Sequence, residues 1–235
     1  MQFFYHNNLD ADNFILSSEE SKHCAKALRK SAGSYIFVTD GQGTLIKGEL
    51  LSVHTEACMV QVVERMENYG LRESILHIGV APTKNPDRME WLVEKCVEIG
   101  IEQISFVRCA HSERPHLDLN RMARLAISAM KQSNTTWLPK MEMIDFQQFI
   151  KNYGDSDADK LIAWCDDQNN QQLTNYPLKS DKIILLVGPE GDFSKEEIAQ
   201  CRQCQFTEIK LGNRRLRTET AALYGCVILA GKFLN

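Results

Sequence analysis

The stretch Ile183–Glu197, IILLVGPEGDFSKEE, decides the fold class. Its first five residues form a continuous apolar run, which is typical of a strand covered on both faces of a parallel sheet. The Gly188–Gly191 turn ends this strand, and Ser194 with Glu197 forms a capping box that predicts a helix start. Ligands of open parallel sheets bind at this edge, but from the turn alone a ligand site and an ordinary strand-to-helix connection are equally supported.

The same alternation of strand and helix extends through most of the chain and predicts a parallel sheet. Further buried strands are expected at Ile75–Val80, Ile101–Val107 and Lys160–Cys165. Helices are expected from Asp87, capped with Glu90, to Gly100, over Arg121–Gln132, and from Asp145. Residues 71–235 are therefore predicted to form one α/β domain.

The first 70 residues follow a different pattern. Short alternating runs occur at Tyr35–Asp40, Thr44–Leu51 and Cys58–Val63, and Asp40-Gly41 is a hairpin signal between the first two. The segment Ser18–Lys30 is predicted to be helical. These features predict a small β-barrel over residues 1–70, with a domain boundary near residues 66–73.

Composition narrows the functional classes. A chain of 235 residues with 43% hydrophobic and 25% charged residues is typical of an ordered globular protein. Its start has neither the layout of a signal peptide nor a membrane-spanning run, so a soluble cytoplasmic protein without a membrane partner is expected. A net charge of −4 argues against a nonspecific nucleic-acid coat, so any RNA partner must meet a local basic patch.

The eight cysteines are scattered through apolar stretches, which indicates buried reduced thiols. Cys201 and Cys204 form a CxxC pair, but no second pair and no histidine stands at zinc spacing. No metal site is predicted.

A second informative stretch is Ile209–Ala222, IKLGNRRLRTETAA, which runs from a strand through Gly212 and three arginines into a helix that Thr218 or Thr220 is expected to cap. Guanidinium groups are suited to gripping phosphate or carboxylate, and Glu219 lies beside them. Taken alone, a solvated charged loop remains the more frequent explanation of such a run.

Together, Gly188–Phe193 and Leu211–Ala221 closely resemble the RsmE family of small-subunit ribosomal RNA uridine-N3 methyltransferases, within the SPOUT superfamily. The resemblance covers nearly the whole chain. Further matching positions are His23 with Leu28-Arg29, Lys84, Arg88–Gly100, Ser112–Arg114, Lys131–Ser133 and Leu138-Pro139. Two departures are Asp192, where the family turn has a second glycine, and Thr135-Thr136, where many members have an arginine.

The resemblance implies a PUA-like barrel for RNA, followed by a SPOUT-type α/β domain with a trefoil knot. It implies methylation of N3 of a specific uridine (uracil-1498 type) in 16S ribosomal RNA, with S-adenosylmethionine as cofactor. It also implies a homodimer in which each pocket is completed by the other subunit. The negative net charge favours a structured target, so we expect the substrate to be the assembled small subunit.

The resemblance also implies roles for individual residues. Uracil N3 is a weakly acidic imide, so we expect Arg217 to stabilise the anion and Glu219 to position Arg217 or accept the proton. RNA contacts are expected from His23, Arg29, Arg114 and Arg121. The cofactor is expected to be held by Trp164, Cys165, Leu186, Gly188, Glu190, Gly191, Leu211, Gly212, Leu216 and Thr218.

Two other functions remain open at this point. One is a nucleotide-dependent transferase that cradles phosphate at Gly188–Gly191, although neither GxxxxGK[ST] nor GxGxxG occurs there. The other is a noncatalytic RNA-binding or ribosome-assembly protein with the same fold. Absence of cofactor affinity would distinguish the latter from an enzyme.

Overall fold

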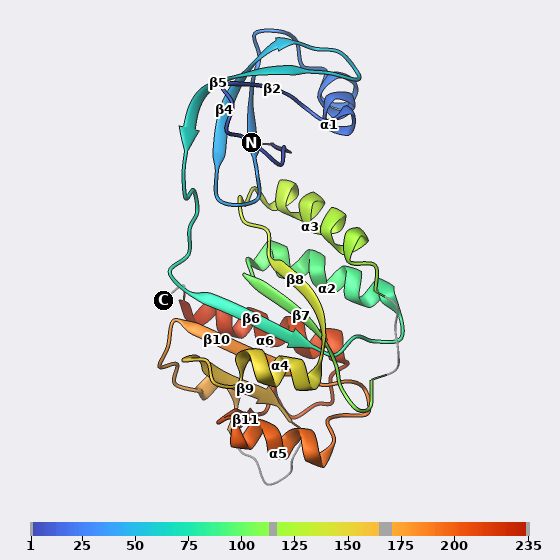
Figure 1. Ribbon diagram of the computed structural model, residues 1–235, viewed down its shortest axis with the longest axis vertical. Helices are drawn as coiled ribbons and strands as arrows, with labels where there is room; N and C mark the ends of the chain where they lie inside the picture. The colour runs from blue at the N-terminus through green and yellow to red at the C-terminus, as the bar shows by residue number, and fades with distance from the viewer. Residues whose placement is uncertain (1, 113–116, 165–170, 234–235) are drawn as a thin grey trace. The chain divides into compact units, whose positions relative to one another are not determined.

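The computed structural model describes residues 2–112, 117–164 and 171–233 (Figure 1). The chain divides into two compact units. The first comprises Met1–Leu71 and Ile127–Leu138, and the second comprises Arg72–Ala126 and Pro139–Asn235. Each unit is built around its own sheet.

The first unit contains a five-stranded half-barrel sheet in the order β1-β3-β4-β5-β2, in which β1 pairs in parallel and the other neighbours pair antiparallel. Its strands are β1 (Phe3–Tyr5), β2 (Asn13–Ile15), β3 (Tyr35–Thr39), β4 (Leu45–Ser52) and β5 (Met59–Met66). Alternate side chains, including Ile36, Val38 and Val60, are buried in one apolar cluster. The predicted two-residue periodicity therefore corresponds to a sheet with one buried face.

The predicted helix over Ser18–Lys30 is shorter and changes type. Helix α1 (Ser18–Lys22) begins where the Ser17 side chain accepts a hydrogen bond from the Glu20 backbone N–H, and it continues as a π-helical turn, η1 (His23–Ala27). Arg29 then takes a left-handed backbone conformation with φ 51°, which ends the helical path before Lys30.

The predicted hairpin turn at Asp40-Gly41 is confirmed, because β3 and β4 pair on either side of it. The Asp40 carboxylate accepts hydrogen bonds from the backbone of Gln42 and Thr44, and Gly43 has φ 95°. A Cβ on Gly43 would lie 2.2 Å from the Trp137 ring, and Gln42 bridges Trp137 through the backbone. The segment that contains Trp137 therefore packs on this hairpin, which the sequence pattern does not indicate.

The second unit contains a six-stranded sheet in the order β11-β9-β10-β6-β7-β8, in which all neighbours are parallel. Its strands are β6 (Ile75–Val80), β7 (Gln103–Arg108), β8 (Lys140–Asp145), β9 (Asp159–Ala163), β10 (Lys182–Val187) and β11 (Thr207–Ile209). Its helical segments are α2 (Pro86–Ile99), α3 (Leu119–Ser133) up to Ala126, α4 (Phe146–Tyr153), η2 (Leu173–Asn175), α5 (Lys195–Gln203) and α6 (Thr218–Phe233). The α/β class and the parallel sheet predicted from the sequence are confirmed.

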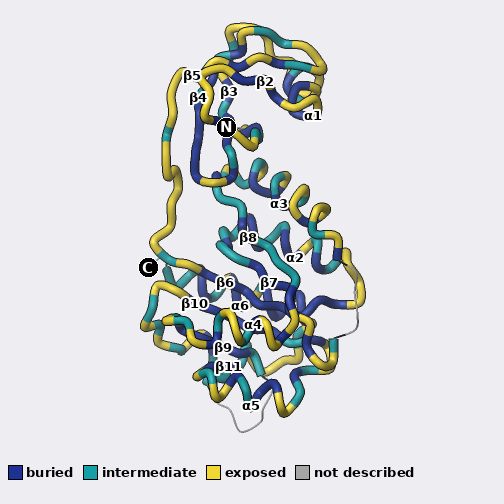
Figure 2. The backbone as a smooth tube through the Cα atoms, viewed as in Figure 1, coloured by how far each residue is buried: buried dark blue, intermediate teal, exposed yellow. Residues whose placement is uncertain are grey.

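Helices cover both faces of this sheet. Helices α2 and α6 pack against each other and α6 lies along β6 and β10, whereas α4 and α5 lie on the opposite face (Figure 1). Along β10, Ile184 and Leu186 pack with Phe149 of α4, whereas Leu185 faces Gly225 of α6. The inner strands β6, β7, β9 and β10 are accordingly mostly dark in the burial view (Figure 2), as the continuous apolar runs predict, whereas the edge strand β8 is largely intermediate.

Two helix starts differ from the sequence predictions. Helix α2 begins at Pro86, because the Asn85 side chain caps it by accepting a hydrogen bond from the Asp87 N–H. Glu90 does not close a capping box and pairs with Arg121 instead. At the start of α4, Asp145 makes no side-chain cap, since its carboxylate pairs with Arg108. The capping box of Ser194 and Glu197 is present as predicted.

In the part of the chain that the structure describes, no helix is both long and apolar enough to cross a membrane, and no group of side chains is arranged to hold a metal ion. The described cysteines are free thiols, of which only Cys204 is half-buried rather than buried. Burial raises the pKa of Cys24 and of Cys201 to about 12, so neither thiol ionises near neutral pH.

A buried polar network around His77 on β6 makes the stability of the second unit depend on pH. The His77 Nε2 lies 2.7 Å from the Ser105 hydroxyl, which in turn donates to Glu142 at 2.5 Å. Burial lowers the pKa of His77 to about 4, below its ordinary value of 6.5. The unfolded chain therefore binds the extra proton first, and stability falls as the pH falls from 6.5 towards 4.

We expect the free energy of unfolding to drop by about 2 kcal/mol between about pH 7 and pH 5 through His77 alone. Urea denaturation of the wild type and of His77→Gln gives the free energy of unfolding at both pH values. The contribution of His77 is the difference between the two proteins in how far this free energy changes with pH. His54→Gln, at an exposed position that belongs to no such network, is the control. An unchanged pH dependence in His77→Gln would show that His77 does not carry the effect.

Candidate functional site

A cavity of about 720 Å³ opens at the carboxyl ends of three neighbouring strands, β9, β10 and β11. Its lining brings together the two stretches that the sequence singled out. The lining consists of residues 163–164, 187–190 and 209–218, with Asp192 and Ala221. Segments that are far apart in the chain therefore form one site, at the edge of the sheet where ligands of parallel sheets bind.

The turn after β10 is held from the other side of the cavity. The Thr218 hydroxyl donates to the Gly188 carbonyl at 3.0 Å, and the Arg215 guanidinium donates to the Glu190 carbonyl at 3.2 Å. Thr218 is itself the first residue of α6, so its side chain joins two segments instead of capping its own helix. These contacts fix the turn relative to the arginine-rich loop.

Asp192 has φ 61°, in the left-handed region that glycine enters without strain. The RsmE-like turn has a glycine at this position, and aspartate is among the few other residues that tolerate the conformation. The Asp192 carboxylate accepts a hydrogen bond from the Phe193 N–H at 2.9 Å, and His111 Nδ1 lies 3.0 Å from the Asp192 carbonyl. The departure from the family pattern thus keeps the backbone shape of the turn.

The arginine-rich loop also depends on a special backbone position. Gly212 has φ 137°, and in the part of the chain that the structure describes no atom beyond its chain neighbours lies within 4 Å of the place of a Cβ, so the loop needs glycine for its conformation and not for space. The loop passes Arg214, Arg215 and Arg217 along the cavity before α6 begins. Three cationic groups therefore line one side of the site.

Glu219 lies in the first turn of α6 and is buried, with only 9% of its side chain exposed. Its Oε1 is 3.6 Å from the Nε of Arg88, and the Nη1 of the same arginine is 3.6 Å from the Glu190 Oε1. Arg88 belongs to a stretch that resembles the family, but the sequence assigned it no role. The sequence does contain an indication of this role. An arginine in the first turn of a helix interacts unfavourably with the helix dipole, so its presence there indicates nearby carboxylates.

The structure brings most of the predicted cofactor residues to the cavity. Leu186 does not line it, because strand alternation directs this side chain into the core around Phe149, and Val187 lines the cavity instead. Gly191 and Glu219 are also not among the lining residues, and Gly191 lies against His111. Predicted residues in the lining are Trp164, Gly188, Glu190, Leu211, Gly212, Leu216, Arg217 and Thr218, and Cys165 lies outside the described residues.

The predicted RNA contacts lie in both units. His23 hydrogen bonds to the Gln2 side chain at 2.8 Å, and Arg29 is exposed at its left-handed position. Arg121 makes two hydrogen bonds to Glu90, at 2.6 and 2.8 Å, which raise the pKa of its guanidinium. Arg114 lies outside the described residues.

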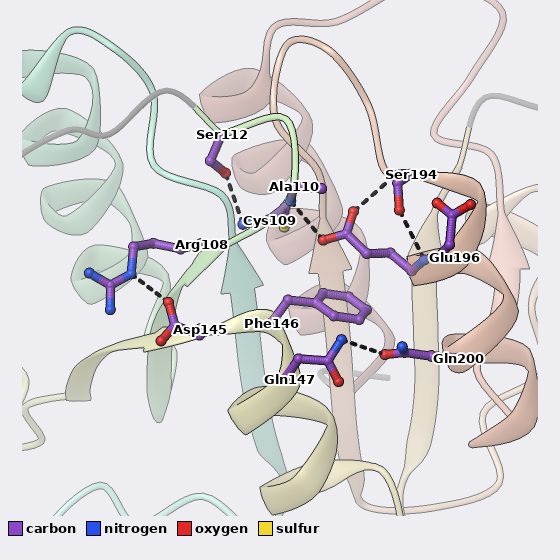
Figure 3. A pocket seen from close by; sticks show the side chains of 11 residues that line it. Arg108, Cys109, Ala110, Ser112, Asp145, Phe146, Gln147, Ser194, Glu196 and Gln200 are labelled. Carbon is purple, nitrogen blue, oxygen red and sulfur yellow. Dashed lines mark hydrogen bonds and ion pairs between the residues drawn. The ribbon is translucent and has the colours of Figure 1, made fainter.

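A second cavity, of about 710 Å³, lies at the carboxyl ends of β7 and β8, beside the starts of α4 and α5 (Figure 3). Polar side chains that line it pair with one another. Arg108 bonds to Asp145 at 2.8 Å and Gln147 to Gln200 at 3.0 Å, while Glu197 accepts from the Ala110 and Ser194 backbones. The first cavity, which contains the two family-like motifs, is therefore the candidate active site.

Comparison with known proteins shows the class. Residues 72–230 match the family model described as an RNA methyltransferase domain. A probable rRNA-methyltransferase of known structure from Porphyromonas gingivalis is 34% identical, with 98% of each chain covered and a TM-score of 0.89. The chain therefore belongs to the RNA methyltransferase family.

Curated relatives give a closer identification. Proteins named ribosomal RNA small subunit methyltransferase E are 26% identical in Bacillus subtilis, over 92% of this chain and 88% of that protein, and 23% identical in Buchnera aphidicola, over 99% and 93%. The Neisseria gonorrhoeae structure of that name, bound to S-adenosyl methionine, is 25% identical, covers 100% of this chain and 98% of its own, and has a TM-score of 0.84. The resemblance to the RsmE family is confirmed.

Proposed function

We propose that this protein transfers the methyl group of S-adenosylmethionine to N3 of one specific uridine, of the uracil-1498 type, in 16S ribosomal RNA of the small subunit. The observation that carries this proposal is the joining of the Gly188–Asp192 turn and the arginine-rich loop around one cavity. The names of the relatives and the S-adenosyl methionine bound by the Neisseria structure support it. The proposed substrate places the protein in the cytoplasm.

The cavity fits the cofactor in size and in the character of its walls. Val187, Leu211 and Leu216 offer apolar surface for an adenine ring, and the two turns offer backbone groups for its polar edge. We propose that the cofactor is held by those of the expected residues that line the cavity, namely Trp164, Gly188, Glu190, Leu211, Gly212, Leu216 and Thr218. The cofactor supplies a methyl group made electrophilic by its positively charged sulfur.

We propose that the arginine-rich loop prepares the uracil for methyl transfer. N3 must lose its proton before it attacks, and the resulting anion needs a fixed positive charge beside it. Arg217 lines the cavity and is the group we assign to that stabilisation. For Glu219 we propose either that it positions Arg217 or that it accepts the proton.

We further propose that residues 1–70, which contain the half-barrel sheet, are a PUA-like RNA-binding domain and that the chain end is threaded as a trefoil knot. The hydrogen bonds from Lys232 near the end of α6 to the carbonyls of Thr174 and Tyr176 support close packing of the chain end on the segment after β9. His23, Arg29, Arg114 and Arg121 remain our proposed RNA contacts.

Transfer of labelled methyl groups tests the substrate. Small subunits, large subunits and protein-free 16S RNA from a strain that lacks the protein are incubated with it and with labelled S-adenosylmethionine. We expect label on small subunits and much less on naked RNA or large subunits. No cofactor binding at all would favour a noncatalytic RNA-binding or ribosome-assembly protein with this fold.

We propose that the protein is a homodimer that associates through the α2 and α6 surface. Trp91, Tyr224 and Val227 are 43%, 42% and 51% exposed on these two helices, an unusual exposure for large apolar side chains on neighbouring elements. We expect the wild type to have twice the 26.8 kDa chain mass in light scattering, and Val227→Asp to shift towards the monomer. Val63→Asp, at a residue 52% exposed in the first unit, should leave the mass unchanged. A wild-type monomer would refute the proposal.

A further inference from the structure

We propose that Arg88 is a positioning residue of the cofactor pocket. By pairing with Glu190 and Glu219 together, it holds the turn after β10 and the start of α6 in the arrangement that binds S-adenosylmethionine. This inference rests on the proposed cofactor pocket and assigns a function to a residue outside its lining.

The three residues come from three separate segments. Arg88 lies in the first turn of α2, Glu190 in the Gly188–Asp192 turn, and Glu219 in the first turn of α6. The Nη1 atom of Arg88 is 3.6 Å from Glu190 Oε1, and its Nε atom is 3.6 Å from Glu219 Oε1. One guanidinium therefore connects the segments on two sides of the cavity from a helix that does not line it.

The position of Arg88 is unfavourable for the helix itself. The first turn of a helix carries partial positive charge, so a cation there destabilises the helix. Asn85 and Pro86 already satisfy the requirements of this helix start. The two carboxylates, and not α2, explain why a cation is favourable at this position.

Glu219 depends on this cation. Its side chain is 9% exposed, and its Oε2 atom is buried without a hydrogen-bond partner within the described residues. Removing Arg88 would leave a buried carboxylate without its compensating charge, which is strongly unfavourable. Glu219 would have to move, and it is adjacent to Thr218, whose hydroxyl holds the Gly188 carbonyl. Removal of Arg88 would thus also displace the Gly188–Asp192 turn, which lines the cavity.

Both contacts, at 3.6 Å, are longer than the roughly 2.7–2.9 Å of a direct charged hydrogen bond. Arg88 therefore acts through its charge more than through a fixed bidentate geometry. A lysine at this position should retain part of the effect, whereas alanine or a neutral amide should not.

The test measures cofactor affinity and turnover separately. We expect Arg88→Ala to raise the Kd for S-adenosylmethionine, measured by calorimetry, about 10- to 100-fold, and Arg88→Lys to give an intermediate value. Most of the loss in methyl transfer should appear in KM for the cofactor, with kcat largely recovered at saturation. In a Glu219→Gln background, Arg88→Ala should have a much smaller effect on Kd, because the charge that it compensates is gone.

Arg202→Ala is the matched control, since Arg202 pairs with Glu208 at 2.6 Å in the same unit but away from the cavity. Glu190→Gln provides a variant that removes only the half-exposed end of the bridge and leaves Glu219 paired, so it should fold and raise Kd about 3- to 10-fold. If Arg88→Ala does not fold, the Kd values of Glu190→Gln and Arg88→Lys test the inference, and wild-type affinity in both variants would overturn it.

A folded Arg88→Ala that binds the cofactor as the wild type does would overturn the inference, and so would a loss confined to kcat. Wild-type protein that fails to bind S-adenosylmethionine would instead refute the proposed function. The two failures are therefore distinguished by the wild-type titration alone.

Discussion

Arg217→Ala is expected to lower the rate of methyl transfer by about 100- to 1,000-fold, because removal of a preorganised group that stabilises developing negative charge has an effect of this size. The Kd for S-adenosylmethionine should stay within a few-fold of the wild-type value, since the cavity is also formed by the turns and by apolar walls. Single-turnover transfer to small subunits at saturating cofactor measures the chemical step directly.

Arg217→Lys is the informative companion variant, because it keeps a positive charge but changes its reach and geometry. We expect its rate to lie between those of the wild type and Arg217→Ala. Near-normal turnover of Arg217→Ala with intact cofactor binding would remove Arg217 from the catalytic role.

Gly212→Ala is expected to raise the Kd for S-adenosylmethionine about 10- to 100-fold. At φ 137° a residue with a Cβ is strained by about 1–3 kcal/mol, and the loop would relax away from the conformation that lines the cavity. Among the described residues, no atom beyond the chain neighbours lies within 4 Å of the place of that Cβ, so the effect would come from the backbone and not from a clash.

Gly231→Ala is a matched control, because its added Cβ also meets none of the described residues within 4 Å, but Gly231 lies inside α6 without a positive φ. It should bind the cofactor normally and be slightly more stable, as alanine favours helix over glycine. Equal affinities in Gly212→Ala and Gly231→Ala would show that the loop conformation seen here is not needed for cofactor binding.

The elements of the second unit are largely predictable because their signals are local. The apolar run that ends at Val187 and the capping box of Ser194 and Glu197 depend on neighbouring residues, and both predictions are confirmed. The strand order depends on pairings between distant segments, which no local pattern specifies. The packing of Trp137 on the Gly43 hairpin is likewise a nonlocal contact, so no local pattern in the sequence indicates it.

The candidate site shows the same division. Gly188, Gly212 and Arg217 are found from their motifs, and the structure gathers them at one cavity. Leu186 points into the core because successive side chains of a strand point to opposite faces. Once Val187 is assigned to the cavity, the same alternation predicts that Leu186 points away from it. The bridge from Arg88 to Glu190 and Glu219 joins three segments, so its partners emerge only from the folded chain.

The proposed function requires the protein to methylate N3 of one uridine in the small-subunit RNA. Small subunits from a strain that lacks the protein, treated with it and with labelled S-adenosylmethionine, can be digested and the modified nucleotide mapped by mass spectrometry. We expect a single methylated uridine with the label on N3, absent when Arg217→Ala replaces the wild type. A label on another base, on the ribose, or at many positions would contradict it.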